Sequence, residues 1–173
     1  MKAQYLDKYT REALPLHHLK TAMADELDWL HQHVWEGVDI NEAKGEADAV
    51  IVGTRWINSN KQDAENPDVR ARLVAQEVAH DHDTAYFAAT PPLEAKRASM
   101  SQMASEQTRG GKALKLSLVD VKKAYFNGVP TRNIYVRLPP ELGLPRNIVG
   151  KLKKCLYGTR DAAQNWEVEY CRF

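Results

Sequence analysis

Asp120 is the residue of this sequence best placed to do chemistry. Residues 114–119, Leu-Lys-Leu-Ser-Leu-Val, largely alternate in polarity, and this period of two predicts a strand with one buried face. The strand would deliver Asp120 at its carboxyl end, where the open edge leaves the carboxylate oxygens free for a hard cation such as magnesium. On spacing alone, the alternative stays open that Asp120 is an ordinary acid facing water.

The residues after Asp120 place several functional groups close together. Lys122, Lys123 and Tyr125 follow directly, and Asn127-Gly128 is a turn signal that closes the segment. The segment therefore combines a candidate metal ligand with two cations and an aromatic ring.

The composition is that of one globular domain. The chain has 173 residues, of which 43% are hydrophobic and 27% charged, which is enough for a core and unlike a collagen-like or disordered chain. No apolar run approaches the roughly 20 residues of a membrane span, and the polar N-terminus is unlike a secretory signal, so we expect no membrane partner. Cys155 and Cys171 lack a zinc spacing and indicate free thiols of a reducing compartment.

The charge is divided unevenly along the chain. Residues 1–110 carry 12 Lys and Arg against 18 Asp and Glu, whereas residues 111–173 carry 12 against 5. Such an asymmetry can mark a surface that faces a polyanion. Packing of a basic C-terminal part beside an acidic N-terminal part explains it equally well.

Hydrophobic periodicity predicts an α+β domain. We expect helices at about 20–35, 93–107 and 159–170, and strands at 50–57, 70–75, 114–119, 134–138 and 151–157. The strands at 50–57 and 70–75 would form a hairpin, and residues 1–20 are a lead-in with a short helix. This order of elements favours an antiparallel sheet over a doubly wound parallel one.

Two of the predicted helices carry more detailed expectations. In the first, Met23, Leu27, Leu30 and Val34 form one apolar face, and Glu36-Gly37 is expected to end the helix. In the last, Thr159 is a candidate N-cap. Its expected apolar face consists of Ala162, Ala163, Trp166 and Tyr170.

Other polar clusters could also form binding sites. Arg70 and Arg72 are two positions apart on a predicted strand and therefore share a face that can bind phosphates, although a solvated strand face is the simpler interpretation. His31 and His33 point apart on a helix. The contiguous residues 80–83, His-Asp-His-Asp, are better explained as a solvated loop than as a metal site.

Segment 120–128, Asp-Val-Lys-Lys-Ala-Tyr-Phe-Asn-Gly, resembles the first catalytic motif of reverse transcriptases. It is most similar to the Asp-Val-Lys-x-Ala-Phe-x-Asn-Gly form of copia-type retrotransposon polymerases. Six further segments resemble that family in the same order and together cover about residues 20–170. In the following list, each segment of this chain is followed in parentheses by the family feature or pattern that it resembles. The segments are 24–35 (an entry helix), 53–57 (family pattern Lys-Trp-Val-Phe), 70–76 (Lys-Ala-Arg-Leu-Val-Ala-Gln), 87–92 (Thr-Phe-Ala-Pro-Val), 134–139 (Ile-Tyr-Met-x-x-Pro) and 156–166 (Leu-Tyr-Gly-Leu-Lys-Gln-Ala-Pro-Arg-x-Trp).

The resemblance implies a role for each candidate residue. Asp120 and the backbone carbonyl of Val121 would bind two Mg²⁺ or Mn²⁺ ions of RNA-directed DNA polymerisation. Tyr125 would be the steric gate against a 2′-hydroxyl, and Asp161 stands where the family has a glutamine near the nucleotide. Arg70 or Arg72 would neutralise the incoming triphosphate. A last group would follow the template–primer backbone: Lys151, Lys153, Lys154 and Arg160.

The resemblance also implies an architecture and partners. It implies a partial right hand, with fingers at about 20–92 and 128–158 and part of the palm at about 93–127 and 159–173. The expected partners are an RNA or DNA template–primer, deoxynucleoside triphosphates, and the rest of a Pol polyprotein, namely the remaining palm, the thumb and ribonuclease H. The implied location is intracellular, either in a cytoplasmic virus-like particle or in the nucleus.

The sequence departs from the family pattern in three places. Residues 159–164, Thr-Arg-Asp-Ala-Ala-Gln, replace the common Leu-Lys-Gln-Ala-Pro-Arg, a form resembling a divergent branch. Helix 93–107 carries polar residues at positions that the family keeps apolar. The sequence also ends at Phe173 before a Tyr-x-Asp-Asp, so we expect that this polypeptide alone does not polymerise.

Three hypotheses follow from these observations. The first is an N-terminal fragment of a copia-type polymerase. The second is a catalytically dead remnant that at most binds nucleic acid. The third is an unrelated domain in which Asp120 is structural, and the shared order of the motifs argues against it.

Overall fold

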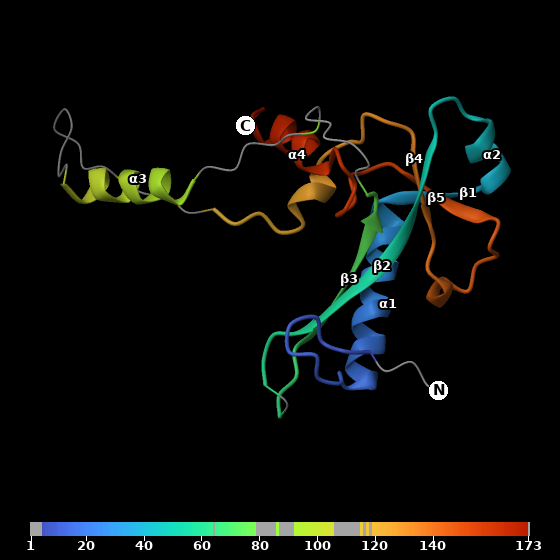
Figure 1. Ribbon diagram of the computed structural model, residues 1–173, viewed down its shortest axis with the longest axis horizontal. Coiled ribbons are helices and arrows are strands. Elements are labelled where there is room, and N and C mark those ends of the chain that lie inside the picture. Colours follow the sequence, from blue (N-terminus) through green and yellow to red (C-terminus); the bar gives the residue numbers. More distant parts are fainter. Residues whose placement is uncertain are drawn as a thin grey trace.

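The structure is a computed structural model that describes residues 5–63, 65–78, 86, 92–105, 115, 117 and 119–172. Its centre is a five-stranded sheet with strand order β1-β5-β4-β2-β3 (Figure 1). The strands are β1 (Trp35–Asp39), β2 (Val50–Asn60), β3 (Val69–Gln76), β4 (Ile134–Arg137) and β5 (Ile148–Leu152). The helices are α1 (Leu16–His33), α2 (Ile40–Gly45), α3 (Leu93–Ser105) and α4 (Ala162–Tyr170), with 3-10 turns η2 (Ala124–Asn127) and η3 (Pro140–Leu142).

The sheet is mixed, which corrects the expectation of an antiparallel sheet. β2 pairs β3 antiparallel, as predicted for a hairpin, but it pairs β4 in parallel from Val50 opposite Ile134 to Val52 opposite Val136. A parallel pair requires a crossover between its strands. The chain between β2 and β4 contains β3, α3 and η2. The two paired strands are therefore far apart in the sequence, and the periodicity of each strand does not show that they pair.

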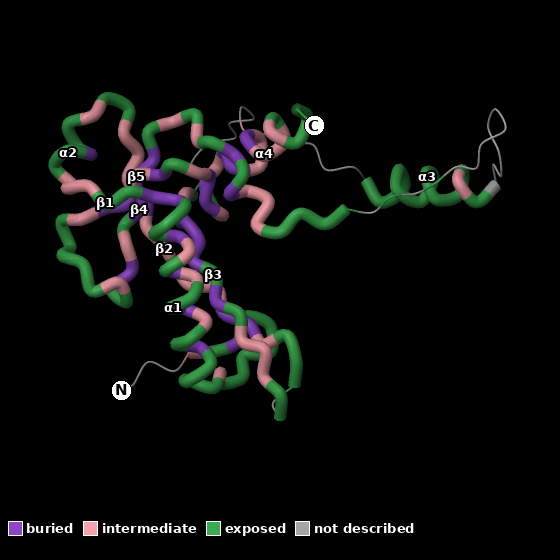
Figure 2. The backbone as a smooth tube through the Cα atoms, turned by 180° about the vertical axis from the view of Figure 1, so that it is seen from behind, coloured by how far each residue is buried: buried purple, intermediate pink, exposed green. Residues whose placement is uncertain are grey.

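Helix α1 covers one face of the hairpin and supplies most of the core on that side. Its predicted apolar face is confirmed, since Met23, Leu27 and Leu30 are buried on it and Val34 is buried just past its end. Leu27, Leu30 and Val34 pack with residues of β3, β4 and the segment after β5, among them Leu73, Val136 and Leu156. Met23 packs with Leu19 and with Ala71 of β3. Buried positions gather along α1 and the sheet (Figure 2).

Several element boundaries differ from the predictions. The first helix begins at Leu16, within the expected lead-in, and Glu36-Gly37 lies inside β1. The last strand spans Ile148–Leu152 instead of 151–157. Both β1 and β5 are short, and they pair from Trp35 opposite Leu152 to Asp39 opposite Ile148. β5 also pairs with β4 on its other edge. Among the described residues of 114–119, none lies in a strand, so the predicted strand before Asp120 is wrong there.

Helix α3 lies apart from the sheet (Figure 1). It was predicted at 93–107, and its described side chains are exposed except for the half-buried Met103. Its Leu93 and Met100 face solvent. None of the described helices is long and apolar enough to cross a membrane. The histidine and aspartate cluster at 80–83 lies outside the described residues.

Candidate active site

Asp120 lies on an exposed loop that leads into η2. Its side chain has no hydrogen bond or ion pair with another described residue, so both carboxylate oxygens are open to a ligand. Within the described ranges, no three His, Cys, Asp or Glu side chains form a group that could hold a metal ion. Asp120 and the Val121 carbonyl are suitable oxygen ligands for a hard cation, but they make up only part of a metal centre.

Lys123 fastens this loop to α1. The backbone of Lys123 is left-handed, with a φ of 54°, and its ammonium nitrogen lies 3.3 Å from the centroid of the Trp29 ring. The same nitrogen lies 3.6 Å from Glu26 Oε2. Burial lowers the pKa of Lys123, against the opposing effect of Glu26, and burial raises the pKa of Glu26. A partly buried cation on an aromatic face therefore connects α1 with the loop that carries Asp120.

Aromatic rings continue from this contact toward β3. Phe126 is buried between Trp29 and Tyr157, with ring centroids 4.9 and 5.1 Å away. Tyr125 stacks at a tilt on Tyr157, with centroids 4.9 Å apart, and burial raises the pKa of Tyr157. The Arg72 guanidinium lies over Tyr157 at 5.9 Å. Arg72 and Tyr125 therefore both contact the Tyr157 ring.

Arg70 does not join that group. Its guanidinium pairs with Asp68 at 3.2 Å near the hairpin end, and both side chains are largely exposed. Arg70 and Arg72 are both exposed on the same face of β3, as predicted, but of the two only Arg72 contacts Tyr157.

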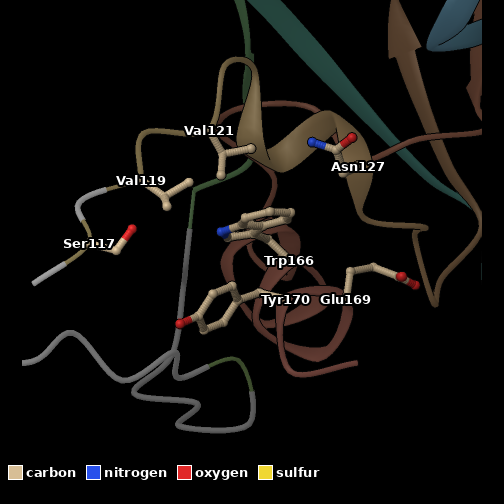
Figure 3. A pocket seen from close by; sticks show the side chains of 7 residues that line it. All are labelled: Ser117, Val119, Val121, Asn127, Trp166, Glu169 and Tyr170. Carbon is tan, nitrogen blue, oxygen red and sulfur yellow. The ribbon is translucent and has the colours of Figure 1, made fainter. Parts of the chain in front are cut away.

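An apolar pocket of about 830 Å³ opens beside the Asp120 loop. Val119 and Val121 face Trp166 and Tyr170 of α4 across it (Figure 3). Val119 is 82% exposed. Val121 is 40% exposed, so both neighbours of Asp120 are open to solvent at this pocket. The same loop is held to α1 by Lys123.

Asp161 is buried in an ion-pair network. Its carboxylate accepts hydrogen bonds from Arg132 and Asn165, each at 3.0 Å. Arg132 also pairs with both carboxylate oxygens of Glu77, at 2.7 and 3.0 Å. These bonds raise the pKa of Arg132. Burial would raise the pKa of Glu77, but hydrogen bonds from Arg132 and from the Arg160 backbone N–H lower it overall.

This network contains residues that the sequence did not single out. Glu77, Arg132 and Asn165 come from the end of β3, the loop before β4 and the helix α4. No local motif marks them, because they meet only in the folded chain. Thr159 is not an N-cap side chain: its hydroxyl donates to the Leu156 carbonyl, and α4 begins at Ala162. Ala163 and Trp166 are half-buried and Tyr170 is exposed, so Ala162 is the one fully buried residue of the expected apolar face.

The comparison with known proteins decides the family. Residues 32–172 match the family model described as reverse transcriptase (RNA-dependent DNA polymerase). This chain belongs to the reverse transcriptase family. The resemblance to copia-type reverse transcriptases is confirmed by the same match and by the relatives named below.

Two relatives show how much of a longer protein the chain covers. It is 27% identical over 164 residues to the retrovirus-related Pol polyprotein from transposon RE1 of Arabidopsis thaliana, covering 91% of this chain and 11% of the relative. It is 23% identical over 168 residues to the transposon Ty1-BL Gag-Pol polyprotein of Saccharomyces cerevisiae, covering 95% and 8%. The chain therefore spans about a tenth of these relatives. No solved structure matches it.

The four cations expected to follow a nucleic acid lie in different surroundings in this reverse transcriptase chain. Lys151 donates to Glu46 at 2.9 Å, and the Tyr135 hydroxyl donates to the same carboxylate. Lys153 is exposed and Lys154 is half-buried, and the backbone N–H of each donates to the Val34 carbonyl. The Arg160 guanidinium lies 4.9 Å over the Tyr86 ring. Lys151 is thus held on the α2 side of the sheet.

Proposed function

We propose that this chain forms the fingers and part of the palm of a retrotransposon RNA-directed DNA polymerase. The fingers would comprise about 20–92 and 128–158, and the partial palm about 93–127 and 159–173. The observation that supports this proposal is an exposed, unpaired Asp120 five positions before Tyr125, whose ring contacts the same Tyr157 ring that Arg72 contacts. The family match supports it over the sequence range that contains all four residues.

In this proposal the residues divide the work of nucleotidyl transfer. Asp120 and the Val121 carbonyl would hold divalent metal, which in such sites activates the attacking hydroxyl and stabilises the leaving pyrophosphate. The Arg72 guanidinium would bind phosphate oxygens of the deoxynucleoside triphosphate in a bidentate manner. Tyr125, held by its contact with Tyr157, would lie against the sugar. Arg70, through its ion pair with Asp68, and the buried Asp161, through its bond to Arg132, would have structural roles away from the nucleotide.

One carboxylate is fewer than a two-metal centre needs. The printed sequence has no Tyr-x-Asp-Asp, and we infer that a polypeptide of these 173 residues does not extend a primer by itself. The test is primer extension with Mg²⁺ or Mn²⁺, using Asp120→Ala as the control. Incorporation above that control by the 173-residue chain would contradict the inference.

A chimera tests the positive part of the proposal. In it, these residues replace the matching segment of an active reverse transcriptase of the family. We expect measurable primer extension that Asp120→Ala abolishes and Arg72→Gln weakens through a higher KM for the nucleotide. A folded chimera in which Asp120→Ala retains full activity would reject the assigned role.

A second candidate function is a nucleic-acid-binding module without catalysis. The observation that favours it is the cation set with Lys153 exposed and Arg160 beside Tyr86. Phosphate contacts release counterions, so template–primer affinity should fall steeply with salt. Binding that does not depend on salt would count against this function.

A further inference from the structure

A basic and aromatic surface runs along β2 from Arg55 toward Lys61 at the hairpin tip and is completed by the N-terminal loop. It is formed by Lys8, Tyr9, Arg11, Arg55 and Lys61, and we call it the N-terminal basic surface. Arg55 lies in the motif at 53–57, and the other four residues lie outside the motifs identified in the sequence. Lys8, Tyr9 and Arg11 also lie before the family match, which begins at residue 32. Figure 1 shows the N-terminal loop beside the far end of β2 and β3.

The loop that builds this surface is held firmly by Asp7. The Asp7 side chain is only 2% exposed, and its carboxylate accepts hydrogen bonds from the backbone N–H groups of Tyr9, Thr10 and Asn60 at 2.6, 2.9 and 2.6 Å. The Lys8 N–H donates to the Asn58 carbonyl at 3.0 Å. The loop is therefore anchored along β2 and presents its cations in a defined arrangement.

The cations surround a pocket without acids. A pocket of about 430 Å³ between the loop and β2 is lined by Lys8, Arg11 and Arg55, together with Tyr5, Trp56 and Asn58. Within the described part of the chain, none of the three cations has an ion pair, and no acidic side chain lines the pocket. Three exposed, uncompensated cations at one pocket favour an anionic ligand.

The acidic side chains near this surface form no ion pair with Lys8, Arg11 or Arg55 in the described part of the chain. Asp7 is buried beneath the loop, Asp63 accepts the Asn66 N–H at 2.7 Å, and Asp68 pairs with Arg70. Glu12 is exposed but does not line the pocket. The cations therefore keep their charge available to a ligand.

Tyr9 indicates which kind of anion fits. Its ring is 69% exposed, and the ammonium nitrogens of Lys8 and Lys61 lie 5.4 and 5.5 Å from its centroid. An exposed ring flanked by cations is a stacking platform for a base whose phosphates meet the neighbouring charges. A free phosphate would use the cations but not the ring.

We propose that the N-terminal basic surface binds the phosphodiester backbone of a single nucleic-acid strand, with a base stacked on Tyr9. This inference rests on the proposed function, because it takes the partner to be nucleic acid. It adds a contact site that lies away from the Asp120 loop and is built in part by residues outside the family match.

The test is fluorescence anisotropy of a labelled single-stranded RNA at several salt concentrations. The variant Lys8→Gln/Arg11→Gln/Arg55→Gln should lower the affinity at least tenfold and reduce the slope of log affinity against log salt by about two, since each phosphate contact contributes about 0.7 for single strands. A matched control, Lys44→Gln/Arg137→Gln/Arg146→Gln, removes the same charge elsewhere and should keep the affinity within about twofold.

Tyr9 gives an independent measurement. Tyr9→Ala should lower the affinity about tenfold with an unchanged salt slope, and Tyr9→Phe should restore it, because stacking needs the ring and not the hydroxyl. Equal thermal unfolding midpoints of the variants and the wild type would show that the fold is intact.

Three outcomes would overturn the inference. The first is an equal loss in the matched control, and the second is full competition by inorganic tripolyphosphate at the same phosphate concentration. The third is loss only in Lys153→Gln/Lys154→Gln, which would leave nucleic-acid binding by the proposed function intact and remove the N-terminal site. Absence of any RNA binding by the wild type would reject both.

Discussion

The ammonium nitrogen of Lys123 lies 3.3 Å from the centroid of the Trp29 ring. Trp29 belongs to α1, and Lys123 stands between the candidate metal ligand Asp120 and Tyr125. The Trp29 ring also stacks on His33, with centroids 4.8 Å apart and planes at 13°. The position of the segment that carries Asp120 therefore depends on a helix far away in the sequence.

We expect Lys123→Met to lower the free energy of unfolding by about 1 kcal/mol, because it removes the cation–π contact and leaves Glu26 without its ion-pair partner. Urea unfolding followed by circular dichroism measures this change. Lys123→Arg keeps a cation that can stack on Trp29 and should recover most of the stability. Equal losses in the two variants would show that the charge on the ring contributes nothing.

Asp120→Ala should leave the free energy of unfolding within about 0.5 kcal/mol of the wild type, because the side chain is exposed and bonds no other described residue. The same urea measurement checks it. This result would separate a loss of activity in the chimera from a loss of fold. A destabilisation of 2 kcal/mol or so, as expected for a buried, bonded acid, would argue for a structural role.

Arg132→Met should destabilise the fold by about 3–5 kcal/mol, because it leaves the buried carboxylates of Glu77 and Asp161 without their cation. Arg132→Lys should restore only part of the loss, since an ammonium group cannot reproduce the bidentate contact with Glu77. The control Arg146→Met removes an exposed arginine of a loop. Similar unfolding midpoints for Arg132→Met and Arg146→Met would contradict the network's role.

Gly158→Ala should prevent stable folding. Gly158 has a φ of 88°, and an added Cβ would lie 2.1 Å from the Ala75 carbonyl oxygen, which belongs to β3. Gly143 is the matched control, with a φ of 65° and nothing within 4 Å of an added Cβ. Gly143→Ala should cost about 1 kcal/mol from backbone strain alone, as measured by thermal unfolding. Equal effects at the two positions would show that the close approach to Ala75 is not limiting.

Stability should fall as the pH drops because of Asp7. Hydrogen bonds from the backbone N–H groups of Thr10 and Asn60 lower the pKa of Asp7 below its usual 3.8. A carboxyl group with a lower pKa in the folded state stabilises the fold fully above its unfolded pKa, and this contribution is lost as the pH falls through the folded value. Asp7→Asn should therefore be destabilised near neutral pH and show a weaker acid dependence below about pH 4. Parallel stability curves for the two proteins would rule out this contribution.

The local patterns of the sequence were sufficient for part of this structure. The spacing of Met23, Leu27, Leu30 and Val34 predicted the buried face of α1. Two strand-like runs around a polar turn segment predicted the β2–β3 hairpin, and alternation predicted β4. These elements are long or strongly periodic, so neighbouring residues contain the information that forms them. The motif around Asp120 identified the family for the same reason, because its residues are contiguous.

Tertiary structure decided the rest. The parallel pairing of β2 with β4, the short strands β1 and β5, and the Glu77–Arg132–Asp161 network all join segments that are distant in the chain. The residues near Asp120 are exposed where alternation predicted a half-buried strand, because pairing requires a partner strand and the described structure places none there. The sequence by itself determined the family and which residues are candidates for the chemistry. Only long-range packing determined that Arg72, and not Arg70, lies with Tyr125 and Tyr157. The pattern of a strand shows which residues share a face, but it does not show which side chains from other segments pack against that face.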